Sequence, residues 1–162
     1  MKYSSDLEKG KVNIQDYKKA FQKLKKKNNK LVDEMFHDLH EKVFEDIDCL
    51  SCANCCKTTS PIFRDVDIKR ISKKLKVKEA QFINSYLKMD EENDFVLKSS
   101  PCFFLGDDNK CSIYEDRPLA CREYPHTNRK NMYQIMGLTL KNVEICPAVV
   151  RVTEKITSSL KK

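Results

Sequence analysis

The sequence has no tryptophan, and it holds only three glycines and five prolines in 162 residues. This scarcity excludes collagen-like and low-complexity chains, whose backbones depend on glycine or proline. No apolar run approaches the roughly 20 residues that a membrane-spanning helix needs, so we expect no membrane partner. The first residues, Met1 to Lys9, contain no apolar segment of the secretory type, and we therefore expect a cytoplasmic protein.

The composition is that of a folded domain with an unusual number of thiols. Hydrophobic residues make up 40% of the chain and charged residues 34%, which excludes wholesale disorder. There are eight cysteines, and in a reducing compartment such a number favours metal binding over disulfides. The formal net charge is +7, which eight ionised thiolates would cancel. We therefore expect the basic surplus to compensate thiolates in part.

Residues 13–47 are predicted to form two helices that are separated at Asn28-Asn29, with Asn13 as the first N-cap. A lysine run from Lys23 to Lys30 surrounds that break and is typical of a solvated helix face. Nucleic acid is not a favoured partner, because no aromatic residue interrupts the run, whereas a protein partner could use these basic helices. Each predicted helix has an apolar stripe: Ile14, Tyr17, Phe21 and Leu24, then Leu31, Met35, Phe36, Leu39, Val43 and Ile47.

The remainder of the chain is predicted to be mainly helical with a small β element. Helices are expected over 65–75, capped by Asp65, over 78–87, after Pro118, and over 147–160. A short strand is expected over 95–97, and a hairpin over 102–114 with its turn at 106–110. The predicted fold class is α+β, mostly helical: an N-terminal helical extension (1–47) followed by a small cysteine-rich metal-binding domain (48–162) with a short β-hairpin.

Half of the cysteines stand within eight residues, as Cys49-x-x-Cys52-x-x-Cys55-Cys56. Each x-x-Cys step can bring another thiolate toward one ion, and the first three match the start of the bacterial ferredoxin pattern. The adjacent pair cannot easily bind one ion together, so one of the two is expected to serve a second metal or to bridge two. A thioredoxin-like redox site is not expected, because helices rather than a βαβ unit precede the motif.

The cysteine segments together resemble a known family. The quartet, the segment Pro101-Cys102-Phe103-Phe104-Leu105, the segment Cys111 to Pro125, and Ile145-Cys146-Pro147 resemble the YkgJ-type cysteine-cluster proteins, also called the CxxCxxCC domain, over about residues 49–150. The resemblance implies chelation of zinc or iron. It also implies an alternative, an iron–sulfur-dependent protein-modifying enzyme of the lysine N-methylase type. His126 departs from the family, which often has an aromatic residue there.

The predicted metal ligands are all eight cysteines: Cys49, Cys52, Cys55, Cys56, Cys102, Cys111, Cys121 and Cys146. They could hold two zinc ions or one 4Fe–4S cluster, and the spacing leaves these alternatives open. We predict no catalytic residue, because the three glycines are isolated and form no methyl-donor loop. Arg117 could donate to a sulfur atom, or it could pair with Glu115 or Asp116 in a turn.

Overall fold

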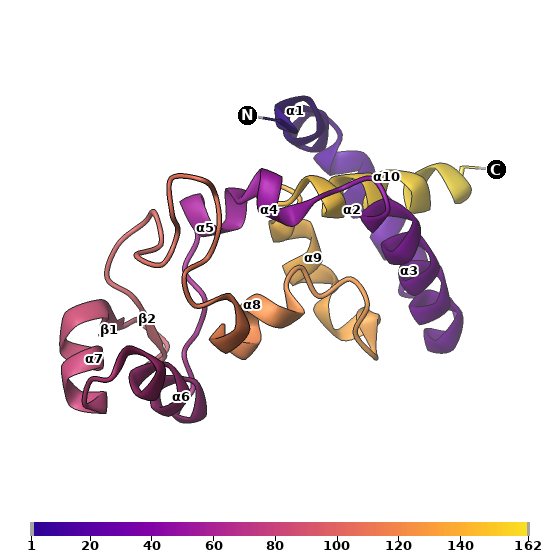
Figure 1. The fold of residues 1–162 in the computed structure, drawn as a ribbon. Coiled ribbons are helices and arrows are strands. Elements are labelled where there is room, and N and C mark those ends of the chain that lie inside the picture. Colours follow the sequence, from indigo (N-terminus) through magenta and orange to yellow (C-terminus); the bar gives the residue numbers. More distant parts are fainter. Residues whose placement is uncertain (1, 162) are drawn as a thin grey trace. The chain divides into compact units, whose positions relative to one another are not determined.

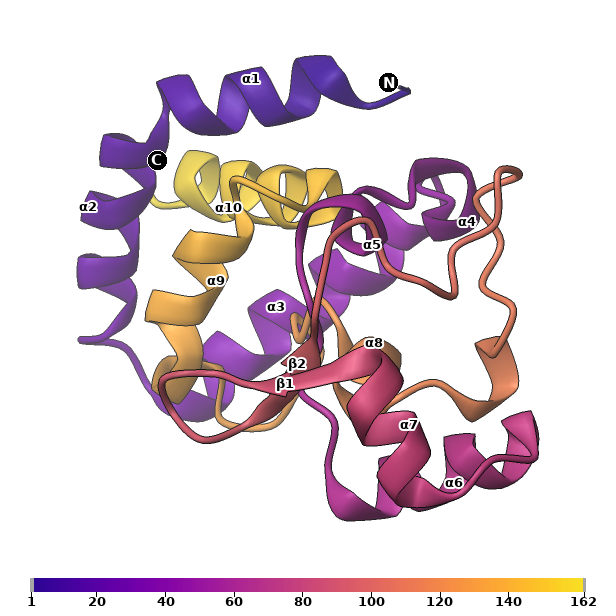
Figure 2. The same cartoon turned by 90° about the vertical axis from the view of Figure 1, so that its left-hand side faces the viewer.

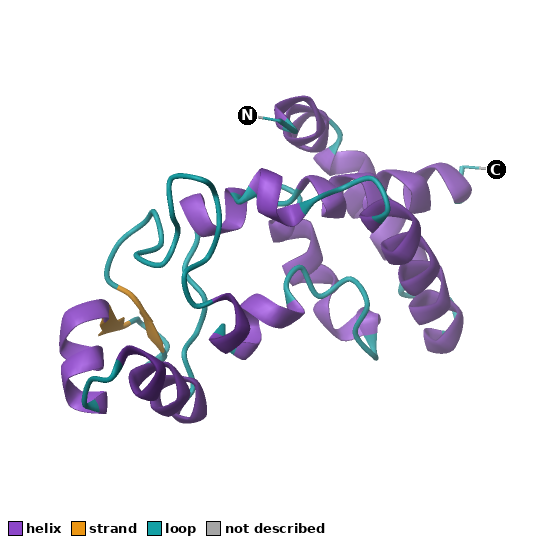
Figure 3. Cartoon of the chain, in the orientation of Figure 1, coloured by secondary structure: helices purple, strands orange, loops and turns teal. Residues whose placement is uncertain are grey.

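The computed structural model describes residues 2–161, which fold into two compact units (Figure 1). The helical unit consists of the residues up to Cys52 together with those from Pro125 onward, and the inserted unit is Ala53–Tyr124. Most of the described residues are helical and two short strands pair, which confirms the α+β, mostly helical fold class (Figure 3). The predicted division at residue 47 stays a prediction. Within residues 2–161, no helix is both long enough and apolar enough to cross a membrane.

The helical unit is built around its last helix. Its elements are α1 (Ser4–Val12), α2 (Ile14–Leu24), α3 (Asn29–Phe44), α4 (Cys49–Cys52), the 3-10 helix η2 (Met132–Ile135), α9 (Met136–Asn142) and α10 (Pro147–Ser159). Helix α10 packs against α1, α2 and α3, and Figure 2 shows α1 running alongside it. The predicted apolar positions of α10 are confirmed as buried: Val149, Val150, Val152 and Ile156.

The break between α2 and α3 lies where the asparagine pair predicted it. The Asn28 side chain accepts hydrogen bonds from the backbone N–H groups of Lys30, at 2.9 Å, and Leu31, at 3.4 Å, and so caps α3. Asn13 occupies the predicted N-cap position of α2, but its side chain makes no capping hydrogen bond, because the side-chain amide donates to the Lys9 carbonyl at 3.0 Å. The predicted stripe of α3 is also shifted at its start, where Leu31 is 44% exposed and Val32 is buried.

Gly10 brings α1 close to the core of the helical unit. A Cβ atom at Gly10 would lie 2.8 Å from Val150 Cγ2 and 2.9 Å from Val143 Cγ1, and both valines are fully buried. Gly10→Ala is therefore expected to lower the free energy of unfolding by about 1–3 kcal/mol, because neither valine can move without disturbing the core. Urea unfolding followed by circular dichroism measures this.

Gly137 provides the matched control. It lies in α9, and a Cβ atom there would have no neighbour within 4 Å. Gly137→Ala is expected to raise the free energy of unfolding by up to about 1 kcal/mol, because alanine has the higher helix propensity. Equal effects of the two substitutions would contradict the close packing of α1.

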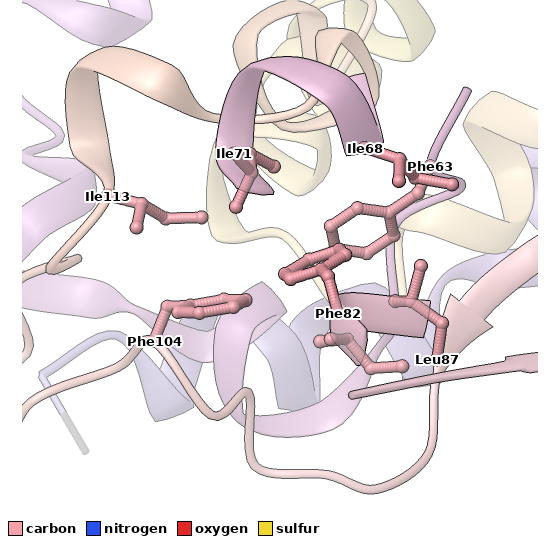
Figure 4. Packing of buried hydrophobic residues seen from close by; sticks show 8 residues of the cluster. Phe63, Ile68, Ile71, Phe82, Leu87, Phe104 and Ile113 are labelled. Carbon is pink, nitrogen blue, oxygen red and sulfur yellow. The ribbon is translucent and has the colours of Figure 1, made fainter. Parts of the chain in front are cut away.

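The inserted unit holds its own hydrophobic core. Its elements are α5 (Asn54–Thr58), α6 (Asp65–Leu75), α7 (Glu79–Tyr86), β1 (Leu87–Met89), β2 (Phe95–Leu97), the 3-10 helix η1 (Tyr114–Asp116) and α8 (Leu119–Glu123). Phe82 lies at the centre of that core, with its ring centroid 6.1 Å from Phe63 and 6.3 Å from Phe104. Figure 4 shows this packing; the core residues are Phe63, Ile68, Ile71, Phe82, Leu87, Leu97, Phe104 and Ile113.

The paired strands lie outside the segment that was predicted to form the hairpin. Strands β1 and β2 pair antiparallel with Leu87 opposite Leu97, and this pairing is the sheet of the inserted unit. The segment 102–114 reverses direction at its predicted turn, but its pairing is limited to one isolated antiparallel bridge between Leu105 and Cys111 in place of two strands. Its turn is closed by the Gly106 N–H, which donates to the Lys110 carbonyl at 2.8 Å.

The start of α6 also differs from the prediction. Arg64, rather than Asp65, occupies the N-cap position. The carboxylate of Asp67, three residues later, accepts the Arg64 backbone N–H at 3.2 Å. This capping hydrogen bond uses the buried carboxylate of Asp67. Asp67, and not the exposed Asp65, therefore fixes the beginning of the helix.

Candidate metal centre

The boundary between the two units passes through the cysteine motif. Cys49 and Cys52 belong to the helical unit, and Cys55 and Cys56 belong to the inserted unit. Of the four later cysteines, only Cys146 lies in the helical unit. The eight predicted ligands are thus divided into a group of three, Cys49, Cys52 and Cys146, and a group of five, Cys55, Cys56, Cys102, Cys111 and Cys121.

The three-cysteine group is formed by the short helix α4 and the beginning of α10. Cys49 and Cys52 are the first and last residues of α4, so one turn of helix separates them. Cys146 directly precedes α10, and its backbone N–H donates to the Asn142 carbonyl at 2.8 Å. Cys52 and Cys146 are buried, whereas Cys49 is exposed. A site formed here would be accessible from one side.

The pKa of the Cys146 thiol depends on the charges of Cys49 and Cys52. Its pKa is raised to about 12, mainly by burial and to a smaller extent by charges on Cys49 and Cys52, while the backbone N–H groups of Val149 and Ala148 oppose the shift. Thiolates that raise one another's pKa lie close enough to share a counter-charge. A bound cation would supply that counter-charge, because metal binding stabilises the deprotonated thiols.

Backbone hydrogen bonds fix the framework of the five-cysteine group. The Cys102 N–H donates to the Cys56 carbonyl at 2.8 Å, which joins the segment after Pro101 to α5. Cys111 bridges to Leu105, and Cys121 lies in α8, where its N–H donates to the Pro118 carbonyl at 3.0 Å. The segment from Cys102 to Cys111 is thereby held near α5, and Cys121 is close enough to Cys56 for the charge of Cys56 to raise its pKa.

The pKa of Cys56 is lowered, whereas those of Cys102, Cys111 and Cys121 are raised. A hydrogen bond from the Cys55 thiol lowers the pKa of Cys56 to about 7; burial opposes this shift, and the nearby Arg117 guanidinium supports it. A thiol with this pKa is about half ionised near neutral pH without any metal. Cys56 is therefore the position where a cation would first find a thiolate.

The other thiols are held protonated by their surroundings. The pKa of Cys121 is raised to about 12, mainly by burial and to a smaller extent by charges on Cys56, Cys102 and Cys111. Burial also raises the pKa of Cys102 and that of Cys111, each with a contribution from Cys56. The charge states of the four thiols therefore depend on one another.

Arg117 faces this group, and within residues 2–161 it forms no ion pair with Glu115 or Asp116 of its turn. Its guanidinium lies 3.4 Å from the centroid of the Tyr114 ring, and its Nε donates to the Tyr114 carbonyl at 2.7 Å. Its charge lowers the pKa of Cys56, Cys111 and Cys121. The arrangement agrees with a cation that faces sulfur, one of the two alternatives left open by the sequence.

A buried ion-pair network positions the Arg117 segment. Asp67 is fully buried, and its carboxylate binds the Arg70 guanidinium at 2.8 Å and accepts the Leu119 N–H at 3.3 Å. Arg70 also donates to the carbonyls of Asp116 and Arg117, at 3.2 and 2.7 Å. Sequence reasoning missed this network; its signal is an aspartate inside the apolar spacing of α6, with arginines three residues away on both sides.

The thiol chemistry fits zinc or iron. Cysteine thiolates are the ligands of structural zinc sites and of iron–sulfur clusters. Among residues 2–161, no group of three or more His, Cys, Asp or Glu side chains stands in an arrangement that could hold a metal ion. Ligation by each particular cysteine therefore stays a prediction.

Comparison with known protein families shows to which family this chain belongs. A family model matches residues 48–146, which is more than half of the chain and contains all eight cysteines. Its family is CxxCxxCC, described as a "putative zinc- or iron-chelating domain". This chain belongs to the CxxCxxCC family. The comparisons with curated proteins and with solved structures gave no match. Membership confirms the predicted resemblance and indicates a zinc- or iron-chelating function for the CxxCxxCC domain.

The histidines of this CxxCxxCC protein have other contacts. His37 Nε2 lies 2.9 Å from the Arg129 carbonyl, and His40 Nδ1 lies 2.7 Å from the Thr127 hydroxyl. Both histidines therefore hold the segment that precedes η2 against α3. His126 has a backbone φ of 66°, in the left-handed region. We do not predict His126 as an additional metal ligand, since eight thiols are already available.

Proposed function

We propose that this CxxCxxCC protein holds metal in two separate thiolate sites, one in each compact unit. The observation that carries the proposal is the division of the thiols. The pKa of Cys146 is raised by charges on Cys49 and Cys52. The pKa of Cys121 is raised by charges on the other thiols of its unit, namely Cys56, Cys102 and Cys111. Each unit therefore has a thiol group of its own with which to bind a cation.

The site in the inserted unit would use Cys56, Cys102, Cys111 and Cys121. Four thiolates are the number that closes a structural zinc site or holds a 4Fe–4S cluster. Cys55 would stay outside this set and donate its hydrogen bond to Cys56, which avoids the strain of two adjacent ligands on one ion. Arg117 would offset part of the negative charge of four thiolates.

The site in the helical unit would use Cys49, Cys52 and Cys146. Three thiolates leave a four-coordinate ion with one position for a further ligand. The exposure of Cys49 places that position at the surface of the unit. The two sites therefore differ in kind: the first would support the fold, and the second could accept a ligand from solution.

The test measures metal in two single variants. The protein is purified anaerobically, and zinc, iron and acid-labile sulfide are measured per chain together with the visible spectrum. Cys121→Ser is expected to lose the metal of the inserted unit alone, and Cys146→Ser that of the helical unit alone. Zinc without a visible band would indicate mononuclear sites, whereas iron with matching sulfide would indicate a cluster.

Ser99→Ala is the control, since this exposed serine lies near Cys102 without belonging to either group. It is expected to keep the full metal content. Loss of all metal in either cysteine variant would contradict two sites and indicate one shared site. A full metal content in both variants would contradict ligation by the two groups.

The alternative of a lysine N-methylase-type enzyme gains no support from the fold. A methyl-donor site commonly uses a glycine-rich loop. Here Gly10 lies inside α1 and Gly137 inside α9, and Gly106 forms a tight turn against Asp108. Chelation by the thiols is therefore the function that the site supports best.

A further inference from the structure

The net positive charge of the chain is concentrated in one unit. The helical unit has 18 lysines and arginines against 12 aspartates and glutamates, a surplus of six. The inserted unit has 13 against 12. Compensation of thiolate charge does not explain this distribution, because five of the eight cysteines lie in the inserted unit.

The surplus comes mainly from two stretches of the helical unit that contain no acidic residue. Seven lysines and no carboxylate stand between Asp16 and Asp33. The second stretch extends from Pro125 to Val143 and includes Arg129 and Lys130. Since nearly 15% of the chain's residues are acidic by composition, both stretches depart clearly from the average.

Helix α3 brings the two stretches together. The Asp33 carboxylate accepts the backbone N–H groups of Asn131 and Met132, both at 2.8 Å. His37, one turn further along the same helix face, contacts the Arg129 carbonyl at 2.9 Å. Lys30 precedes Asp33 by three residues and therefore shares that face. Figure 2 shows the connection from α2 to α3 and the orange segment before α9 at the same end of the unit.

These contacts create a surface of positive charge. Its members are all exposed, and we call them the lysine surface: Lys23, Lys25, Lys26, Lys27, Lys30, Arg129 and Lys130. Within the described part of the helical unit, the only ion pair of this set is Lys30 with Glu34, at 3.8 Å and largely solvated. Asp33 is nearby, but its carboxylate is already occupied by two backbone N–H groups.

An aromatic ring and several amide side chains accompany the lysine surface. Tyr133 follows directly after the segment held by Asp33, and it is 36% exposed. Asn28, Asn29 and Asn128 are exposed between the basic residues. The lysine run contains no aromatic residue. The contact of η2 with α3 brings Tyr133, which is about 100 positions away in sequence, to the helix that follows this run.

We propose that the lysine surface binds single-stranded nucleic acid, with the cations on phosphates and Tyr133 stacked on a base. Lysine and arginine side chains neutralise phosphates, and aromatic rings add stacking that tolerates any base. An acidic peptide would match the charge but would leave the ring and the amides without a partner. A membrane surface would require several exposed apolar side chains beside the cations, whereas the basic segment 23–30 exposes none and the adjoining Leu31 is a single one, 44% exposed.

The experiment measures fluorescence anisotropy of a labelled single-stranded oligoribonucleotide, about 12 nucleotides long, with the full-length protein. Lys25→Glu, Lys26→Glu and Lys27→Glu combined are expected to weaken binding at least about tenfold at low salt. The slope of log affinity against log salt should fall by about 2, since each lost phosphate contact contributes about 0.7 for a single strand. Tyr133→Ala is expected to weaken binding about fivefold, and Tyr133→Phe should retain it.

A triple variant of equal charge provides the control. Lys73→Glu, Lys74→Glu and Lys78→Glu reverse three exposed lysines of the inserted unit, and this variant should change affinity less than about threefold. Equal weakening by both triple variants, or no binding at about 50 mM salt, would overturn the proposal. Equally tight binding of a polyglutamate peptide would overturn it in favour of an acidic protein partner. Unchanged affinity with Tyr133→Ala would overturn the stacking contact.

Discussion

Asp67→Asn is expected to lower the free energy of unfolding of the inserted unit by about 3 kcal/mol. The substitution keeps the shape of the side chain but removes its charge, and Arg70 then loses a buried partner at 2.8 Å. The Arg64 guanidinium, 3.0 Å away, loses the same partner. Breaking such a pair on one side costs more than the pair itself contributes, because Arg70, whose side chain is only 29% exposed, is left partly desolvated without its counter-charge.

Asp65→Asn is the matched control, since it changes an exposed aspartate in the first turn of the same helix. Its effect should stay within about 0.5 kcal/mol, as for most surface substitutions. Urea unfolding of both variants, followed by circular dichroism, measures the difference. A loss below about 1 kcal/mol for Asp67→Asn would show that the network does not hold the unit together.

The same carboxylate predicts how stability depends on pH. Burial alone would raise the pKa of Asp67, but hydrogen bonds from Arg64 and Arg70 outweigh burial and bring the pKa to about 2. Because the folded-state pKa is below the ordinary value, ionised Asp67 stabilises the fold fully above about pH 4. About 2 kcal/mol of stability is lost as pH falls from about 4 to 2, and Asp67→Asn should not show this loss.

Removal of metal is expected to open the inserted unit while the long helices of the helical unit stay folded. This result rests on the proposed chelation. The inserted unit has a core of eight residues and short elements, so a bound ion would contribute directly to its folding free energy. We expect a loss of at least about 3 kcal/mol there, since small domains depend on such cross-links.

Hydrogen exchange with and without a chelator under anaerobic conditions measures this effect. Amides of α6, α7 and β2 should lose protection, whereas those of α2, α3 and α10 should keep most of theirs. Restored protection after addition of zinc or iron is the control for chelator damage. Equal loss of protection in both units, or none in either, would contradict the expected result.

Periodic apolar patterns were sufficient to predict the longer helices, including α3, α6 and α10. Helix α1 escaped prediction because it buries only Leu7 and Gly10 and leaves Val12 81% exposed, so no stripe marks it. Its position depends instead on tertiary contacts with α10, such as the paired hydrogen bonds of Arg151 with Asp6, both at 2.9 Å. Such contacts join positions too distant for a local pattern to reveal.

The pairing of β1 with β2 and the grouping of the thiols could not be predicted from the sequence for a related reason. The segment 87–89 continues the helical spacing of α7, and its strand character arises only from pairing with 95–97. Likewise, the motif at 49–56 is continuous in sequence, and nothing local shows that its halves fold into different units. Spacing could therefore predict which residues are candidate ligands, while the path of the chain decides which of them meet.

The interruption of the helical unit has a consequence for synthesis on the ribosome. Residues up to Cys52 must wait for α10, which is the partner of α1, α2 and α3 and is made last among them. The inserted unit, by contrast, is complete once Tyr124 has emerged. Because domains fold as their residues become available, we expect the insertion to fold before its host. If both thiol groups bind metal, the five-cysteine group would be loaded first, and Cys49 and Cys52 would remain without Cys146 until later.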